Sequence, residues 1–243
     1  MRVIILAAGC GRRMNPLTNS IPKCLLPINN ETILERLINQ LKKNSIDSIT
    51  VVVGYKKEKI FDAVGSQYDS IKFIVNDMFY EDVNILSLSL ALQQDLTPFY
   101  LFEADCIFEN RCFNLIFDPS TRKKSIWFSK GFLKEEQYGG IIKSNESGEV
   151  VDIKIIEKYE KSYKNYRKMI GIMKVGEKEL NRYSNYLFEA CDKSINQFYH
   201  IPWINNQDKL KSHLCDFKDL KVTSINTIGD YSKAQEMFKN EAD

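Results

Sequence analysis

Residues 2–18 read RVIILAAGCGRRMNPLT, and residues 22–28 read PKCLLPI. After Arg2, the segment up to residue 8 is an unbroken apolar run, which is typical of a strand buried on both faces. Two glycines, Gly9 and Gly11, follow this strand directly. Glycine lets a backbone turn tightly and brings its N–H groups close to an anion. The stretch therefore predicts a phosphate-binding loop, although an ordinary turn between a strand and a loop would read similarly.

Positive charge surrounds the predicted loop. Arg12 and Arg13 lie beside it, and Lys23 sits on a segment stiffened by prolines. A guanidinium can hold phosphate oxygens at two points, and an ammonium is a compact charge for a reacting phosphate. The loop is not a Walker loop, because no GK[ST] follows, and not a dinucleotide fingerprint, because Met14 stands where a third glycine is needed.

The rest of the first half alternates strands with helices. Strand patterns cover residues 2–8, 48–55, 71–76 and 99–105, and helical patterns cover residues 31–44 and 84–94, with Asn84 as the expected N-cap. Such alternation predicts a mostly parallel sheet covered on both faces. In the second half, strand patterns at residues 124–130, 138–144, 149–156, 169–175 and 220–226 and a helix at 177–195 suggest an antiparallel extension. A final helix is expected after Thr227, which has capping-box spacing to Asp230.

These patterns predict an α/β fold with a Rossmann-like, mixed and mostly parallel central sheet, helices on both faces and an irregular antiparallel C-terminal extension. We expect a single domain over residues 1–243, with a nucleotide-binding half at 1–120 and an acceptor-binding half at 121–243. The apolar and aromatic second half would also allow packing against a second subunit in a homo-oligomer.

Composition narrows the class of protein. A formal charge of +2 over 243 residues gives no reason to expect a nucleic-acid partner. The six cysteines include no CxxC pair, which favours reduced thiols in a cytoplasmic protein. No apolar stretch of the sequence approaches the length of roughly 18 residues that is needed to span a bilayer, so no membrane partner is expected.

The string LAAGxGxRMxPLT followed by PKxLLPI resembles the N-terminal signature of the nucleotidyltransferases that make nucleoside-diphosphate sugars and alcohols. In that family the acceptor's phosphate attacks the α-phosphorus of a nucleoside triphosphate, and pyrophosphate leaves. The resemblance implies that Gly9 and Gly11 hold the triphosphate, that Arg13 neutralises pyrophosphate, and that Lys23 contacts the α-phosphate and the acceptor phosphate. It also implies a nucleotide site that includes the side chains and backbone of Leu6, Ala7, Ala8, Tyr55, Asn84, Ser87 and Glu103.

The segment FEAD at residues 102–105 resembles the metal-binding strand end of the family. The resemblance implies that Asp105 binds Mg²⁺. Strand periodicity places Glu103 on the same face, where it is either a second acidic group of the site or a structural hydrogen-bonding group. The family usually supplies another Asp from a late strand, but SINTIGDY at residues 224–231 has Asn226 at that position. An amide oxygen brings no charge, so the expected metal affinity is lower.

The order Glu-Ala-Asp at residues 103–105 and the Asn-x-x-Ser-Leu pattern at residues 84–88 resemble small CTP-dependent enzymes. Those enzymes act on phosphocholine, 2-aminoethylphosphonate and related phosphorylated small molecules, and their CDP-linked products serve surface glycan or lipid modification. The expected function is therefore an Mg²⁺-dependent cytidylyltransferase that takes CTP and a phosphorylated small-molecule acceptor. Asn84 and Ser87 would lie near the base or the acceptor, or would serve only as a helix cap and a packed hydroxyl.

Two other functions remain open from the sequence. One is a sugar-1-phosphate nucleotidyltransferase that uses UTP, dTTP or another nucleotide, and the other is a catalytically weak nucleotide-binding protein, because of Asn226. A quaternary ammonium acceptor would need aromatic faces. The candidates for such a cage are Trp127, Phe128, Tyr138, Tyr199 and Trp203.

Overall fold

The computed structural model describes residues 1–65, 68 and 70–239, so residues 66, 67, 69 and 240–243 of the predicted domain lie outside the described part. The strands are β1 (Arg2–Ala7), β2 (Pro27–Ile28), β3 (Glu31–Thr32), β4 (Ser48–Val53), β5 (Ile71–Val75), β6 (Phe99–Glu103), β7 (Cys106–Phe108), β8 (Ile126–Phe132), β9 (Gly139–Ser144), β10 (Val150–Ile156), β11 (Arg167–Val175), β12 (His213–Asp216) and β13 (Val222–Ser224). The helices are α1 (Ile33–Lys43), α2 (Lys57–Ile60), α3 (Ile85–Gln94), α4 (Asn110–Ile116), α5 (Glu177–Lys193), α6 (Ile201–Ile204) and α7 (Ile228–Phe238).

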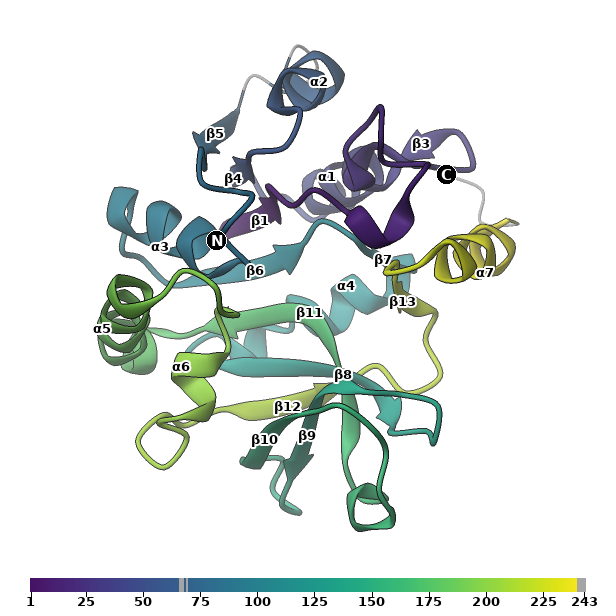
Figure 1. The fold of residues 1–243 in the computed structure, drawn as a ribbon. Coiled ribbons are helices and arrows are strands. Elements are labelled where there is room, and N and C mark those ends of the chain that lie inside the picture. The colour runs from purple at the N-terminus through teal and green to yellow at the C-terminus, as the bar shows by residue number, and fades with distance from the viewer. Residues whose placement is uncertain (66–67, 69, 240–243) are drawn as a thin grey trace.

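The main sheet has β1 near its middle, with all six residues of that strand buried. β4 and β6 flank β1 in parallel, and β5 extends the sheet beyond β4. On the other side, β11 pairs antiparallel with β6 and leads to β8, β9, β10 and β12 (Figure 1). This is the expected mixed sheet: the strands of the first half pair in parallel, and those of the second half pair antiparallel, except that β12 pairs with β8 in parallel.

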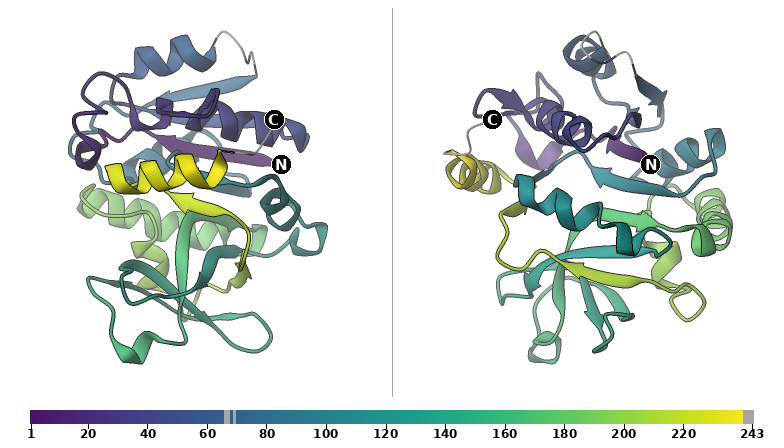
Figure 2. Two further views of the ribbon diagram at one scale, coloured as in Figure 1. Left: turned by 90° about the vertical axis from the view of Figure 1, so that its right-hand side faces the viewer. Right: turned by 180° about the vertical axis from the view of Figure 1, so that it is seen from behind.

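Helices cover both faces of this sheet (Figure 2). One apolar core joins β1, β4 and β6 to α1 and α4, and a second joins the opposite face of the same strands to α3 and α5. α1 forms where the sequence predicts it, because apolar residues recur on one face and Thr32 and Glu35 form a capping box at its start. α7 begins in the same way at Thr227 and Asp230.

Sheet register sets the position of the site. Leu6 of β1 lies level with Glu103 of β6, so the carboxyl ends of these two parallel strands reach the same edge. Ligands of α/β proteins bind outside this edge. β13 pairs antiparallel with β7, with Ser224 opposite Cys106, and thereby brings residues from late in the chain to the end of β6.

The segment at residues 99–105 is one strand in the sequence pattern but not in the structure. β6 ends at Glu103, and β7 starts at Cys106. Between them the backbone finds other partners: the Ala104 N–H donates to Leu6 at 3.1 Å, and the Asp105 carbonyl accepts from Ile225 at 2.9 Å. This break turns the Asp105 side chain toward the edge of the sheet, where the loop after β1 also lies.

Candidate active site

A cavity of about 320 Å³ opens at the carboxyl ends of β1 and β6. Nearly all the residues expected to bind nucleotide or metal line it. These are Leu6, Ala7, Ala8, Gly9, Gly11, Arg13, Lys23, Asn84, Ser87, Glu103, Asp105 and Asn226. Three segments that are far apart in sequence therefore meet in this cavity. They are the loop after β1, the end of β6 and the late segment around Asn226.

The loop after β1 is held by its own backbone geometry. Gly11 has a φ of 62°, in the left-handed region that favours glycine, and starts a short 3₁₀ turn at Arg12–Met14. The Thr18 hydroxyl donates to the Gly11 carbonyl at 3.0 Å, which ties the far end of the loop to its start. A fixed loop of this kind keeps its backbone N–H groups in position for an anion.

Tyr55 does not line the cavity in the way expected of a nucleotide-binding residue. Its backbone N–H donates to Ala8 at 3.0 Å, and its hydroxyl donates to the Thr18 carbonyl at 3.0 Å. Tyr55 thus supports both ends of the loop and is not among the residues that line the cavity. The sequence predicts Tyr55 as a nucleotide-binding residue, but its observed contacts are with the backbone of Ala8 and Thr18.

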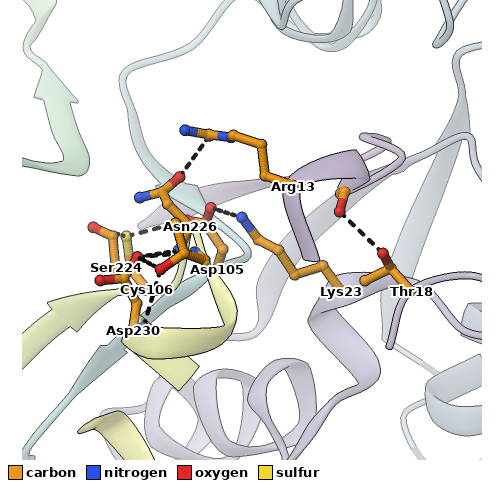
Figure 3. Close-up of polar contacts among 10 residues, drawn as sticks. Arg13, Thr18, Lys23, Asp105, Cys106, Ser224, Asn226 and Asp230 are labelled. Carbon is orange, nitrogen blue, oxygen red and sulfur yellow. Dashed lines mark hydrogen bonds and ion pairs between the residues drawn. The ribbon is translucent and has the colours of Figure 1, made fainter. Parts of the chain in front are cut away.

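Lys23 and Asp105 form an ion pair at the floor of the cavity, and Figure 3 shows their side chains directed at each other. The side chains are 15% and 18% exposed, so this pair is largely withdrawn from water. Lys23 begins a short 3₁₀ turn directly after Pro22, which fixes its backbone. Attraction between charges is stronger in such a poorly solvated position than at the surface, so Lys23 and Asp105 hold each other in the cavity.

Arg13 and Asn226 form a second polar contact beside this ion pair. The Arg13 guanidinium donates to the Asn226 amide oxygen at 2.8 Å (Figure 3). The Asn226 backbone N–H donates in turn to Asp230 at 3.1 Å, so the capping carboxylate of α7 also orients Asn226. Asp230 is therefore the helix-capping residue that its spacing predicts, and Asn226 is the late-strand residue that reaches the site.

Asn84 stands at the start of α3, but its side chain does not cap the helix, contrary to the sequence prediction. Its amide oxygen accepts a hydrogen bond from the Tyr199 N–H at 2.9 Å instead. Asp82 takes over the capping, because its carboxylate accepts from the N–H groups of Leu86 and Ser87, both at 3.0 Å. A carboxylate is stabilised at a helix start by these donors and by the helix dipole.

Ser87 is buried and belongs to the same group of polar contacts. Its hydroxyl donates to Asp82 at 2.7 Å and accepts from Asn76 at 2.9 Å. Burial raises the pKa of the Asp82 carboxyl, and its hydrogen bonds from Ser87, Leu86 and Asn76 oppose that rise. Asp82 lines the cavity and was not among the predicted site residues. Its spacing to the first turn of α3 was the signal that could have identified it.

Glu103 lies at the inner end of the cavity. Burial, together with the neighbouring Asp105 charge, raises the pKa of its carboxyl to about 7, and Lys23 and a hydrogen bond from the Tyr199 hydroxyl oppose the rise. Gly171 of β11 faces Glu103 across the paired strands, and a Cβ atom there would overlap the Glu103 carboxylate. The close approach of the two strands thus requires glycine at position 171.

Comparisons with known proteins show the family of this chain. The family model of the MobA-like NTP transferase domain matches residues 3–112. The chain is 30% identical over 225 residues to a 2-aminoethylphosphonate cytidylyltransferase of Lancefieldella rimae, covering 91% of this chain and 83% of that protein. The chain belongs to the nucleotidyltransferase family.

Two further comparisons cover almost the whole nucleotidyltransferase. A choline-phosphate cytidylyltransferase of Streptococcus pneumoniae is 27% identical over 245 residues, covering 99% of this chain and 100% of that protein. A solved structure of a CTP:phosphocholine cytidylyltransferase from the same species superimposes with a TM-score of 0.84 at 24% identity, covering 98% of each chain. The family and fold expected from the opening motif are thereby confirmed.

The donor set of this nucleotidyltransferase fits a divalent metal ion. Enzymes of the family generally use such an ion. Ligand atoms of Glu103, Asp105 and Cys106 lie within 4.8 Å of one another. Carboxylate oxygens suit a hard cation such as Mg²⁺, whereas burial raises the pKa of the Cys106 thiol well above its usual range and keeps it protonated. The carboxylates of Glu103 and Asp105, with the amide of Asn226 nearby, are therefore the groups that would hold the ion.

The aromatic residues considered for an ammonium cage do not form one. Trp127, Phe128, Tyr199 and Trp203 are buried in the apolar cores, and Tyr138 is exposed. The aromatic side chains that do line the cavity are Phe79 and Phe198, which no motif in the sequence identifies. All six cysteines are free thiols, as expected. Among the described residues, no helix combines the length and apolar character needed to cross a bilayer.

Proposed function

We propose that this nucleotidyltransferase transfers CMP from CTP to the phosphate or phosphonate of a small molecule. An oxygen of the acceptor's phosphate would attack the α-phosphorus of CTP, the bond from that phosphorus to the β-phosphate oxygen would break, and pyrophosphate would leave. The observation that carries the proposal is the Lys23–Asp105 ion pair at the floor of a cavity whose other walls are the loop after β1 and Arg13. The two cytidylyltransferase relatives support the choice of CTP.

Each charged residue has a role that its position supports. The loop at Gly9–Gly11 would receive the triphosphate through backbone N–H groups, as the opening motif suggests. Lys23 would neutralise the charge that gathers on the α-phosphate and the attacking phosphate, and Arg13 would stabilise the departing pyrophosphate. The attacking phosphate is already ionised at neutral pH, so the reaction needs no general base.

Mg²⁺ is the metal ion that we propose, held by Asp105 with Glu103 and Asn226 beside it. When bound, the ion would neutralise phosphate charge during the displacement. In the structure, the Lys23 ammonium donates to a carboxylate oxygen of Asp105, and the Arg13 guanidinium donates to the amide oxygen of Asn226. We infer that nucleotide phosphates draw both cations away from these oxygens when substrate binds, which would free the oxygens for the ion.

Asn84 is the group best placed to contact the base. Its amide oxygen is used by Tyr199, but its amide nitrogen has no hydrogen-bond partner within the described part of the chain. Cytosine presents acceptor atoms on its pairing edge, so this N–H₂ group would donate to the base. Ser87 has both its donor and an acceptor position in use, so its role would be to orient Asp82.

The two halves of the chain would divide the substrates between them. Apart from Phe198 and Asn226, the residues that line the cavity come from residues 1–120, which supports a nucleotide-binding first half. The acceptor would then enter from the side of residues 121–243. The free cysteines support a cytoplasmic location, where CTP is available.

The test is pyrophosphate release with Mg²⁺, in which CTP, UTP, dTTP, GTP and ATP are each combined with phosphocholine, 2-aminoethylphosphonate, glycerol phosphates, phosphorylated amino-acid derivatives and sugar 1-phosphates. The proposal predicts turnover with CTP and a non-sugar acceptor, and its loss in Lys23→Ala. Lys57→Ala is the matched control, since Lys57 pairs with Asp77 at 3.1 Å on the exposed surface. Turnover confined to a sugar 1-phosphate would contradict the proposal, as would nucleotide binding without turnover.

A further inference from the structure

Two lysines in the antiparallel extension beyond β6, outside the lining of the cavity, have no role in the chemistry proposed above. Lys130 is on β8 and Lys168 is on β11, and these strands pair so that Ser129 lies opposite Met169. The two lysines are therefore neighbours across the strand pair. Both are partly buried, and neither forms an ion pair among the residues that the structure describes. The Lys168 ammonium donates to the Gly140 carbonyl at 3.1 Å, which is an uncharged partner.

These two charges lie near each other on β8 and β11, and β11 also packs against Glu103 at the cavity. Burial lowers the pKa of both ammonium groups, and the Lys130 charge lowers that of Lys168 further, to about 8. Lys168 precedes Gly171 by three residues on β11, and Gly171 packs against the carboxylate of Glu103, which lines the cavity. The Glu103 charge raises the pKa of Lys168 and so acts in the opposite direction. Two like charges placed together away from water are unfavourable unless an anion joins them.

A histidine next to Lys168 is also without a partner. The buried Nε2 of His200 has no hydrogen-bond partner among the described residues. Burial, and then the Lys168 charge, lower the pKa of His200 to about 4, so its ring is neutral at pH 7. The ring of Phe198 stacks on that of His200 with centroids 5.0 Å apart, and Phe198 lines the cavity. The unpartnered nitrogen thus lies one side chain away from the cavity.

The same region offers little to a cation. Of the five aromatic residues considered for a cage, four are buried in the cores, and within the described part of residues 121–243 Phe198 is the one aromatic side chain that lines the cavity. The Glu103 carboxylate already accepts a hydrogen bond from Tyr199 and has a raised pKa. An ammonium group entering here would meet the two ammonium groups of Lys130 and Lys168.

We propose that the acceptor carries a second acidic group besides the phosphate or phosphonate that attacks CTP, and that Lys130 and Lys168 bind this second group. The inference rests on the proposed function. The acidic group would give the two lysines the direct ion pair that neither forms among the described residues, and an oxygen or N–H of the acceptor would pair with Nε2 of His200. A carboxylate and a second phosphate share this chemistry, so both sources are compared in the test.

The test compares matched acceptors by calorimetry, using the enzyme with Mg²⁺ and a non-hydrolysable CTP analogue. O-phosphoserine and phosphoethanolamine differ by one carboxylate, and glycerol 1,3-bisphosphate and glycerol 3-phosphate differ by one phosphate. We expect the more acidic member of at least one pair to bind about tenfold more tightly, the effect of one charge-assisted hydrogen bond. The pair that shows the preference identifies the acidic group.

Variants then assign the preference to the two lysines. The quantity to follow is the affinity for the more acidic member of a pair divided by the affinity for the less acidic member. In Lys168→Gln and Lys130→Gln this ratio should fall toward one. Lys168→Arg keeps the charge and should preserve most of the ratio. Lys174→Gln is the matched control, because Lys174 is a buried lysine near the opposite end of β11 that donates to the Thr121 carbonyl at 2.6 Å. Its removal should leave the ratio unchanged, whatever it does to stability.

Three results would overturn the inference. They are equal binding within both pairs, tighter binding of the less acidic members, and equal weakening of both members of a pair in Lys168→Gln, which would assign the charge to the shared phosphate. In all three the proposed function stands if CTP still binds and turns over. If the wild-type enzyme binds no CTP analogue, the proposed function fails, and the inference fails with it.

Discussion

Replacement of Gly9 by alanine separates the two interpretations of the opening loop. Gly9 lines the cavity, its φ lies outside the left-handed region, and a Cβ atom built there has no other atom within 4 Å. The folded protein therefore has room for alanine at this position. If Gly9 serves only as a turn, the change should neither destabilise the protein nor weaken the binding of CTP. If the triphosphate lies against the loop, the methyl group occupies space that a phosphate needs.

The expected sizes of the two effects differ. Alanine at a compatible backbone position leaves the free energy of unfolding unchanged or raises it by up to about 1 kcal/mol, because the unfolded chain loses freedom. Displacing a phosphate from one backbone N–H removes a charge-assisted hydrogen bond of about 1.5–3 kcal/mol, which weakens CTP binding by roughly 10- to 100-fold. The variant should thus be as stable as the wild type but poor at binding.

Gly11→Ala is the control, because this variant, unlike Gly9→Ala, should lose stability. Gly11 has a φ of 62°, and its Cβ would lie 3.2 Å from both Lys23 Cβ and Thr18 Cγ2. The left-handed backbone and this crowding should lower the free energy of unfolding by about 1–3 kcal/mol. The assays are urea unfolding and calorimetric titration with CTP and Mg²⁺. Unchanged CTP affinity in Gly9→Ala would refute a phosphate-binding role for Gly9, and a large loss of stability would refute the geometric argument.

Four other changes test the site. Lys23→Ala should lower kcat in the pyrophosphate assay by about a hundredfold or more, because the charge acts mainly in the transition state, and near-normal kcat would exclude Lys23 from the chemistry. Asp105→Asn should raise the Mg²⁺ concentration for half-maximal rate, and an unchanged Mg²⁺ dependence would count against Asp105 as a ligand. Asn226→Asp adds a carboxylate and should lower that Mg²⁺ requirement; a fall in turnover at every Mg²⁺ concentration would instead make the amide part of a working site. Burial holds the pKa of His200 at about 4, below its usual 6.5, so the unfolded chain binds the proton more readily. The free energy of unfolding should therefore fall by up to about 3 kcal/mol between pH 6.5 and 4, and His200→Gln should lack this part of the fall, as urea unfolding at several pH values will measure.

Local chemistry explains why much of the fold could be predicted. The apolar run before Gly9, the recurring apolar face of α1 and the capping box at Thr32 and Glu35 all depend on residues a few positions apart. Such features form in any context that buries the same face, so the sequence alone determines them. The family motif likewise spans one continuous stretch. The nucleotidyltransferase assignment was therefore available before the structure.

Predictions about side-chain partners were less secure, because several groups compete for each partner. Asn84 has the right residue type and position for a cap, yet Asp82 takes that role once Tyr199 occupies the Asn84 amide oxygen. Tyr55 belongs to a nucleotide-associated motif, yet its hydroxyl meets the backbone at Thr18. Spacing along the chain indicates which groups are near, but only packing decides which of them pair.

The sequence by itself determined the elements and the identity of the chemical groups, since hydrophobic periodicity, caps and the glycine-rich loop act over a few residues. Only the tertiary structure decided how these groups meet. The register of β1 with β6 brings Lys23 to Asp105, and the pairing of β7 with β13 brings Asn226 to Arg13. The pairing of β8 with β11 places Lys130 beside Lys168. These contacts depend on sheet pairing between distant segments, which no local pattern encodes.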